Sequence, residues 1–393
     1  GSKRLRPPPP HSATHTPAAT LPTTKAGGRG GRRAADPRSP GEETMGAEAE
    51  QQQQQQLLPP SPQAGKADPP AVVGLQVSAL IDHVARVDWS LLDRVPGDRG
   101  GSQQVSFEEL DHILNEVNAL ILPSHDDPSP VRTMAGGSVA NTVRGLSAGF
   151  GISTGIIGAR GDDDQGILFV NNMSFSGVDL TRLRAKKGHT AQANEFTKED
   201  FQGSKWLVVR YAQQNLAQII EAIRVAKQEG LSVSLDLASF EMVRDYRSQL
   251  IALLETGNID LCFANEDEAR EIIGGGLTYD PEDALAFLSK HCKWAVVTLA
   301  SKGCIAKHGK QVVHVPAIGE SNAVDATGAG DLFASGFLYG LVKGLPLEEC
   351  CKVGVCSGGS VVRALGGEVR PENWQWMYKQ MHAGGLLLPE LKN

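Results

Sequence analysis

One glycine-rich segment combines residues that could bind a phosphate group and remove a proton. Gly328, Ala329 and Gly330 precede an apolar stretch that begins at Asp331 and has the length of a helix. The first turn of a helix has free N–H groups and a positive dipole end, and small side chains let an anion approach them. A carboxylate there could accept a proton from a hydroxyl group that attacks the bound phosphate. The segment therefore indicates phosphoryl transfer, with Asp331 as a simple helix cap being the alternative.

Two other glycine segments point to ligand binding less directly. Gly136 and Gly137 precede a second predicted helix, in which Asn141 lies one turn from the start and could hydrogen-bond hydroxyl groups. The alternative is a glycine turn with an ordinary N-terminal cap. The loop from Gly158 to Gly166 carries aspartates at 162–164, which favour a solvated acidic turn over a cation site. The P-loop sequence GxxxxGK[ST] does not occur in the chain.

Alternating strands and helices must position these segments. A buried strand is predicted over 71–77, a half-exposed strand over 82–88 and a helix over 107–122. Further strands are predicted at 206–209, 231–235, 259–263 and 294–299, with a hairpin at 304–315. The helices between and after them are predicted at 213–229, 240–254, from about 267, 281–290, 331–342 and 347–362. Such alternation predicts a mostly parallel sheet covered on both faces by helices.

Composition excludes several classes of protein. The chain has 393 residues, of which 40% are hydrophobic and 21% charged, and a net charge of −7, so most of it is expected to be globular and a poor nucleic-acid binder. No apolar run reaches the length of a membrane span. The six cysteines lack a CxxC pair, so we expect buried thiols of an intracellular protein rather than a zinc site or a disulfide framework.

The first 70 residues have the composition of a disordered segment. They contain a proline run, six consecutive glutamines and no aromatic residue, and residues 1–44 carry a net charge of +5. A basic start of this kind is compatible with an organelle transit peptide, with a plain disordered tail, or with translation that begins at Met45. We therefore expect a cytoplasmic protein, or one of a plastid or other organelle if residues 1–44 are a transit peptide.

Taken together, the segments resemble the PfkB family of carbohydrate kinases. Residues 136–141 (GGSVAN) look like its first signature, and residues 325–331 (DATGAGD) look like its second, with Ala326 where threonine is usual. The spacing of Gly158, Gly161, Asp163 and Gly166 also fits, as does the NxxE element at 265–268. The resemblance covers roughly residues 71–385. It implies a ribokinase-like three-layer α/β/α fold in residues 71–393, with a small β lid near 78–106.

The resemblance also implies a role for individual residues. Asp331 would be the catalytic base, and the amides of Gly328, Ala329 and Gly330 would form the anion hole. The implied substrate-binding residues are Asp82, placed at the end of the first strand, Gly136, Gly137 and Asn141.

On the nucleotide side, Thr298, Gly303 and Gly366 would contact ATP. Asn265 and Glu268 would order Mg²⁺. Asp325 matches a monovalent-cation loop, which makes K⁺ a further candidate. The implied activity is ATP-dependent phosphorylation of a hydroxymethyl group by a monomer or homodimer. The acceptor would be a sugar or nucleoside, closest to the adenosine-kinase-like branch, with no nucleic acid or membrane partner.

The sequence departs from the family at one place. In the family, a strand pair with a Gly-x-Arg turn stands between the positions of Ala191 and Ala193, where this chain has only Gln192. Roughly 15 residues, the length of two strands and a turn, are therefore absent. The retained Asp331 and Glu268 favour an active kinase, whereas the absent strands favour a catalytically weak relative with a binding or regulatory role.

Overall fold

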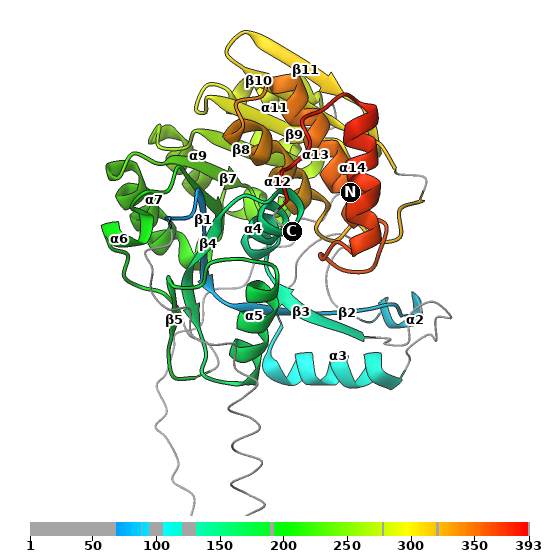
Figure 1. The fold of residues 1–393 in the computed structure, drawn as a ribbon. Coiled ribbons are helices and arrows are strands. Elements are labelled where there is room, and N and C mark those ends of the chain that lie inside the picture. The colour runs from blue at the N-terminus through cyan, green and yellow to red at the C-terminus, as the bar shows by residue number, and fades with distance from the viewer. Residues whose placement is uncertain are drawn as a thin grey trace, which may run out of the picture. The chain divides into compact units, whose positions relative to one another are not determined.

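A nine-stranded sheet lies at the centre of the fold, in the order β11-β10-β9-β8-β7-β6-β1-β4-β5 (Figure 1). The computed structural model describes residues 68–87, 89–92, 94, 105–119, 131–188, 192–276, 279–319 and 322–391. Seven strands are parallel: β1 (Val72–Ser78), β4 (Thr154–Arg160), β5 (Leu183–Ala185), β6 (Trp206–Arg210), β7 (Ser232–Asp236), β8 (Leu261–Asn265) and β9 (Trp294–Thr298). The hairpin of β10 (Cys304–His308) and β11 (Gln311–Val315) joins one edge antiparallel, as predicted.

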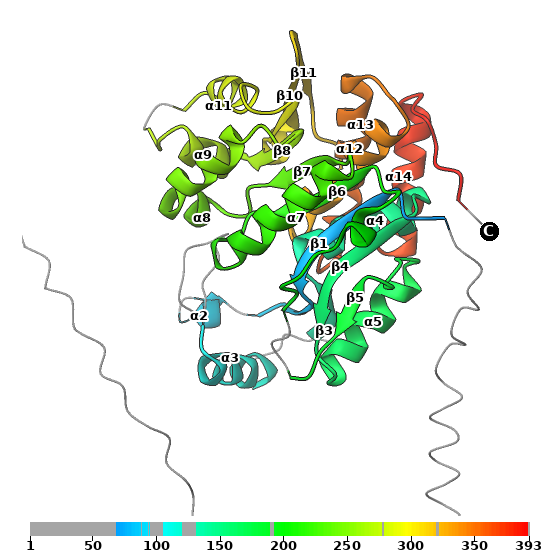
Figure 2. The ribbon, with the colours of Figure 1, turned by 90° about the vertical axis from the view of Figure 1, so that its left-hand side faces the viewer.

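Helices cover both faces of this sheet because successive strand residues point to opposite sides. Val73 and Leu207 belong to one buried cluster, and their neighbours Val72 and Val208 belong to the other. The first cluster includes residues of α7 (Leu216–Gln228), α8 (Phe240–Asp245), α9 (Arg247–Glu255), α10 (Glu266–Ile272) and α11 (Pro281–Leu288). The second includes residues of α4 (Ser138–Phe150), α12 (Ala329–Val342), α13 (Leu347–Val361) and α14 (Pro371–Ala383) (Figure 2). The three-layer α/β/α architecture is confirmed.

Some predicted elements differ in their details. The single helix expected over 240–254 is divided into α8 and α9, because Tyr246 leaves helical geometry with φ −122° and ψ 29°. The predicted helix over 107–122 is present as α3 (Phe107–Ala119). The sequence patterns did not identify β4, β5, α14 or the helix α5 (Asp164–Phe175).

A separate two-stranded sheet is formed by β2 (Leu80–Ala85) and β3 (Val131–Gly136), which pair antiparallel. The small β lid was expected near 78–106. The described part of that range holds β2 and the short helix α2 (Trp89–Leu92), whereas β3, the partner strand of β2, lies beyond it, from residue 131 onwards. Asp82 therefore lies within β2, opposite Met134, and not at the end of the first strand.

Several sequence predictions fall on parts of the chain that the structure does not describe. Residues 1–67 lie outside the described residues, and so do Thr190 and Ala191 at the expected strand-pair position. In the described ranges, no helix is long and apolar enough to span a membrane. The six cysteines, at 262, 292, 304, 350, 351 and 356, are buried free thiols, in keeping with the prediction.

Candidate active site

Polar residues end four neighbouring parallel strands. Because the carboxyl ends of parallel strands meet at one edge of the sheet, these residues are brought together there. They line a cavity of about 120 Å³ with the first turn of α12; the set includes Arg210, Asp236, Asn265, Thr298, Gly330 and Asp331. Residues far apart in sequence thus form one polar site at the point where the glycine-rich loop enters its helix.

The predicted glycine loop is the cap and first turn of α12. Gly328 is the N-cap in the left-handed conformation, with φ 78° and ψ 0°. A Cβ atom at this position would lie 2.9 Å from the Cα of Gly367, so both conformation and space favour glycine. The amide of Ala329 donates to the carbonyl of Ala326 at 3.1 Å, so it is engaged in the turn. The positive end of a 14-residue helix faces this site, which suits an anion.

The carboxylate of Asp331 is held by a different helix. Ser138 Oγ donates to Oδ1 at 2.5 Å and Asn141 Nδ2 donates to Oδ2 at 2.9 Å, both from the start of α4. Asp331 is the third residue of α12, whose N-cap is Gly328. Its carboxylate is therefore oriented by α4 and does not form the N-cap of α12.

Of the predicted substrate-binding residues, Asn141 contacts Asp331 directly, and the Gly136–Gly137 turn precedes the same helix, α4. A Cβ atom on Gly136 would collide with the carboxylate of Asp82, and a Cβ on Gly137, where φ is +94°, would lie 2.8 Å from Gln76 Nε2. Gln76 fixes this turn, because its Nε2 donates to the Gly136 carbonyl at 3.0 Å and its Oε1 accepts from an amide of α4. Burial raises the pKa of Asp82, against the opposing charge of Arg144. The charge of Asp331 raises that pKa further.

Sequence reasoning missed several residues of this site. They are Gln76, Ser138, Arg144, Arg210 and Asp236. Arg144 is 4% exposed, and its Nη2 donates to Asn141 Oδ1 at 2.6 Å, which leaves the Asn141 amide nitrogen facing Asp331. Arg210 and Asp236 could have been found, since each directly ends a predicted strand of a parallel sheet.

The NxxE element forms a capping box at the start of α10. Both oxygens of Glu268 accept hydrogen bonds from Asn265, from its backbone N–H and its side-chain Nδ2, each at 2.8 Å. Burial raises the pKa of Glu268 to about 8, and the charge of Asp236 contributes to that rise. Burial also raises the pKa of Asp236, against the attraction of Arg210. Two carboxyl groups therefore share a poorly solvated cavity and oppose each other's ionisation.

The two predicted metal residues do not lie in one cluster. In the described ranges, no three His, Cys, Asp or Glu residues are grouped to hold a metal ion. Glu268 lines the 120 Å³ cavity, whereas Asp325 does not. Asp325 accepts from the Thr327 amide at 3.0 Å and the Gly366 amide at 2.8 Å, and so links the loops before α12 and α14. Asp163 caps α5 by accepting from the Gly166 amide, in keeping with the acidic-turn interpretation of 162–164.

A second cavity, of about 330 Å³, adjoins the polar site. It is lined by small and apolar residues, including Ala317, Ile318, Phe333, Val355 and Gly358. Thr298 and Gly330 line both cavities, and Gly303 lines the larger one. Gly366 does not line it, and a Cβ atom at this position would lie 2.9 Å from the Met134 side chain of β3; its contact with ATP stays a prediction.

The raised pKa of Glu268 predicts a pH dependence of stability. The neutral Glu268 carboxyl contributes to the free energy of unfolding. This contribution is fully present below pH 4.5, the ordinary pKa of glutamate, and is lost as the pH rises through about 8. Glu268→Gln, which cannot ionise, should therefore raise the melting temperature more at pH 9 than at pH 6. Thermal unfolding at both pH values, without nucleotide, measures this. Glu255→Gln, the same change at an exposed glutamate at the end of α9, is the control; an equal effect of Glu268→Gln at both pH values contradicts the prediction.

Comparison with known proteins identifies the family. Residues 109–373 match the pfkB family carbohydrate kinase. The chain belongs to the PfkB family. This PfkB protein is 24% identical over 296 residues to a nucleoside kinase from Methanocaldococcus jannaschii, covering 70% of this chain and 95% of the relative. It is 33% identical to an ATP-dependent 6-phosphofructokinase from Thermoanaerobacterium thermosaccharolyticum over 124 residues, 31% of this chain and 36% of that enzyme.

The solved structures agree with the family assignment. Adenosine kinase from Sinorhizobium meliloti has a TM-score of 0.65 and 27% identity, over 79% of this chain and 98% of its own. The PfkB protein has the ribokinase-like fold, with a mostly parallel sheet and flanking helices. It is a phosphotransferase of the class that acts on sugars or nucleosides.

Proposed function

We propose that this PfkB protein transfers the γ-phosphate of ATP to the hydroxymethyl group of a sugar or nucleoside. The observation that carries the proposal is the placement of Asp331. Its carboxylate lies at the start of α12, is oriented by Ser138 and Asn141, and lines a cavity of about 120 Å³ beside a larger apolar one.

The acceptor would bind between α4 and the two-stranded sheet of β2 and β3, which would form the lid. Asp82 from β2, the Gly136–Gly137 turn and Asn141 offer a carboxylate, backbone amides and an amide side chain, which together suit sugar hydroxyls. Asp331 would accept the proton of the attacking hydroxyl, since it is the carboxylate nearest the helix start that binds the phosphate. The Arg144–Asn141–Asp331 hydrogen bonds would hold that base in position.

The donor would occupy the two adjoining cavities. The adenine ring suits the 330 Å³ cavity with its apolar wall around Phe333, and the phosphates suit the smaller polar cavity that shares Gly330. The first-turn amides of α12 would stabilise negative charge on the transferring group. The 6-phosphofructokinase relative, whose name describes it as ATP-dependent, supports ATP as donor.

The carboxyl groups of Asp236 and Glu268 would suit a bound Mg²⁺. A divalent cation would offset the mutual repulsion of Asp236 and Glu268, and oxygen ligands are those that Mg²⁺ prefers. Because both oxygens of Glu268 already accept from Asn265, Glu268 would act through ordered water. Mg²⁺ supplies charge neutralisation at the phosphates. K⁺ beside Asp325 is a further part of the proposal, as a cation that would order the 325–327 loop.

Arg210 is proposed to supply positive charge to the transferring phosphate. It lines the same cavity as Asp331, and its Nη2 donates to the Ala238 carbonyl at 2.6 Å, which holds the guanidinium in place. Arg210→Gln is expected to lower kcat about tenfold, the loss of one charged hydrogen bond. Steady-state kinetics would measure it. Arg247→Gln is the matched control, because Arg247 also donates to a backbone carbonyl but lies outside the cavity; equal losses in both variants contradict the proposal.

The acceptor can be assigned by a panel assay. Formation of ADP is measured with adenosine, inosine, ribose and fructose, each with Mg²⁺ and ATP. The nucleoside kinase and adenosine kinase relatives support a nucleoside, whereas ribose or fructose is the sugar alternative. Turnover with none of the four, together with intact ATP binding, would favour the alternative of a catalytically weak protein with a binding or regulatory role.

A further inference from the structure

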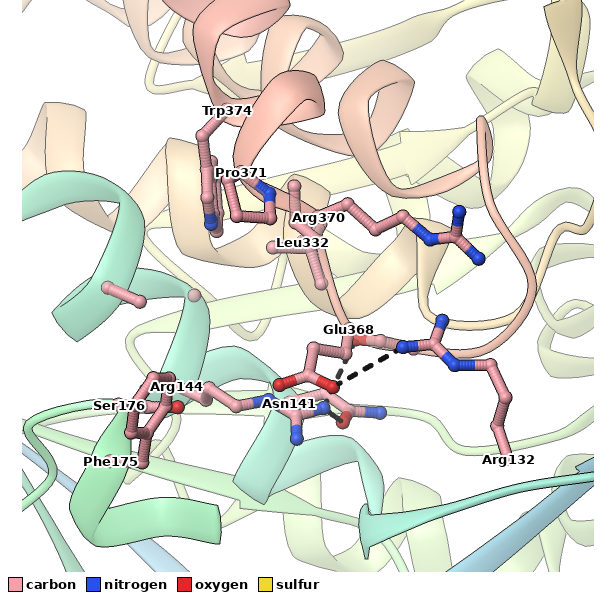
Figure 3. A pocket seen from close by; sticks show the side chains of 14 residues that line it. Arg132, Asn141, Arg144, Phe175, Ser176, Leu332, Glu368, Arg370, Pro371 and Trp374 are labelled. Atoms are coloured by element: carbon pink, nitrogen blue, oxygen red, sulfur yellow. Dashed lines mark hydrogen bonds and ion pairs between the residues drawn. The ribbon is translucent and has the colours of Figure 1, made fainter. Parts of the chain in front are cut away.

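A third cavity lies along α4, beyond Asn141. It has a volume of about 390 Å³, and its walls come from α4, the end of α5 and the start of α14 (Figure 3). Of the proposed acceptor-binding residues only Asn141 reaches it; Asp82, Gly137 and Asp331 do not line it. The cavity shares no lining residue with the two cavities proposed for the nucleotide. It therefore adjoins the proposed acceptor site at Asn141 and is separate from the two cavities proposed for the nucleotide.

The lining of this cavity carries an excess of positive charge. Its charged lining residues are three arginines, Arg132, Arg144 and Arg370, and one carboxylate, Glu368. A guanidinium nitrogen of Arg132 lies 3.8 Å from a carboxylate oxygen of Glu368, and a dashed line joins the two side chains in Figure 3. Three guanidinium groups and one carboxylate give the lining two more positive than negative charges.

Arg144 is the most buried of the three arginines, at 4% exposed. Its hydrogen bonds go to neutral oxygens, those of Ala135, Asn172, Asn141 and Gly367. Among the described residues, no carboxylate lies within ion-pair distance of it. Burial lowers the pKa of Arg144, and Glu368 is the strongest opposing charge. A buried cation with this environment is costly unless an anion accompanies it.

The opposite wall of the cavity is apolar. Leu332, Pro371 and Trp374 line it, and the ring of Phe175 at its edge is 92% exposed. The volume falls in the range of about 300–1,000 Å³ that small-molecule sites have, and is larger than inorganic phosphate needs. A ligand that matches both walls combines a doubly charged anion with a ring or carbon skeleton.

We propose that this cavity binds a phosphate monoester. The phosphate, with a charge of about −2, would balance the excess of positive charge, and the planar guanidinium groups can bind it in bidentate fashion. The ring would lie against Trp374 and Phe175. A carboxylate ligand, with a single charge, would balance only half of that excess.

Two hydrogen bonds connect this cavity to the proposed base. Arg144 Nη2 donates to Asn141 Oδ1 at 2.6 Å, and Asn141 Nδ2 donates to Asp331 Oδ2 at 2.9 Å. A phosphate that draws the Arg144 guanidinium towards itself weakens the bond that orients Asn141. Occupancy is therefore expected to lower kcat, which makes the cavity an inhibitory site.

Binding is tested by calorimetry with phenyl phosphate, in the presence of saturating Mg²⁺ and a non-hydrolysable ATP analogue that fills the nucleotide cavities. One molecule should bind per chain, and the Kd should rise about tenfold in Arg370→Gln and in Arg132→Gln. Arg224→Gln, an exposed arginine on α7, is the matched control and should leave the Kd unchanged. Binding of inorganic phosphate as tight as that of phenyl phosphate, an unchanged Kd in both cavity variants, or no binding overturns the proposal.

Two further experiments identify the class of phosphate ester that binds and measure its effect on turnover. Under the same conditions, tighter binding of AMP than of ribose 5-phosphate assigns the ligand to nucleotides, and the reverse assigns it to sugar phosphates, provided that Arg370→Gln weakens either. Saturating phenyl phosphate should lower kcat in the wild type but not, at that concentration, in Arg370→Gln. An unchanged kcat overturns the inhibitory coupling. Because binding is measured without turnover, this test remains valid if the proposed kinase reaction fails.

Discussion

Asp331→Asn is expected to lower kcat by about 10²–10⁴-fold, the range for loss of a positioned general base. Asparagine keeps the size of the side chain and can still accept from Ser138, but it cannot take the proton of the acceptor hydroxyl. Asp331 lines the cavity proposed for the phosphates but not the 330 Å³ cavity proposed for the adenine ring, so ATP should still bind. Single-turnover kinetics and an independent measurement of nucleotide binding separate the two effects.

The control for this prediction is a carboxylate that only caps a helix. Asp280 is the N-cap of α11 and accepts from the Glu282 amide at 2.9 Å. Asp280→Asn should leave kcat nearly unchanged, since asparagine also caps helices well. If Asp331→Asn behaves like Asp280→Asn and retains turnover near that of the wild type, the assignment of Asp331 as the base is wrong.

Local sequence patterns were sufficient for most of the central fold. Short buried runs such as 206–209, followed by helical periodicity, correctly predicted the parallel strands β6 to β9. Sequence patterns did not identify a strand whose pairing partner lies far away in the sequence. β3 has a mixed polar and apolar sequence, and its pairing with β2 spans the segment between residues 85 and 131, so no local signal joined the two.

The same contrast between local patterns and distant contacts explains why only part of the site was predicted. Glycine loops before helices can be read directly, because only a few residue types tolerate a conformation such as that of Gly328. The hydrogen bonds that orient Asp331 could not be read, since Ser138 lies 193 residues away and a serine in a first helical turn is ordinary. The burial of Arg144 could not be predicted either, because an arginine within a helix is normally exposed.

The second large effect is expected at Gln192, where the resemblance predicts that a strand pair of the family is absent. The described residues between β5, which ends at Ala185, and the short helix α6 (Lys198–Phe201) contain no strand. The lid is thus a pair of strands, β2 and β3, with β2 half-exposed along its length. A two-stranded sheet is marginally stable on its own and offers unpaired edges. Water would then reach the acceptor site, weaken its polar contacts and loosen the position of the acceptor.

We therefore expect that inserting a homologous strand–turn–strand between Ala191 and Ala193 raises kcat/KM for the acceptor about 10²-fold, the effect of correcting a misplacement of about 1 Å. The affinity for ATP should stay the same, because no residue of β2 or β3 lines the 330 Å³ cavity. An insertion of equal length made of glycine and serine is the matched control, since it lengthens the loop without adding strands. If the chain without any insertion already turns over at about 1–100 s⁻¹, the usual range for kinases, the lid is sufficient as it stands. An equal gain from the glycine–serine insertion would show that loop length, and not strand pairing, limits the reaction.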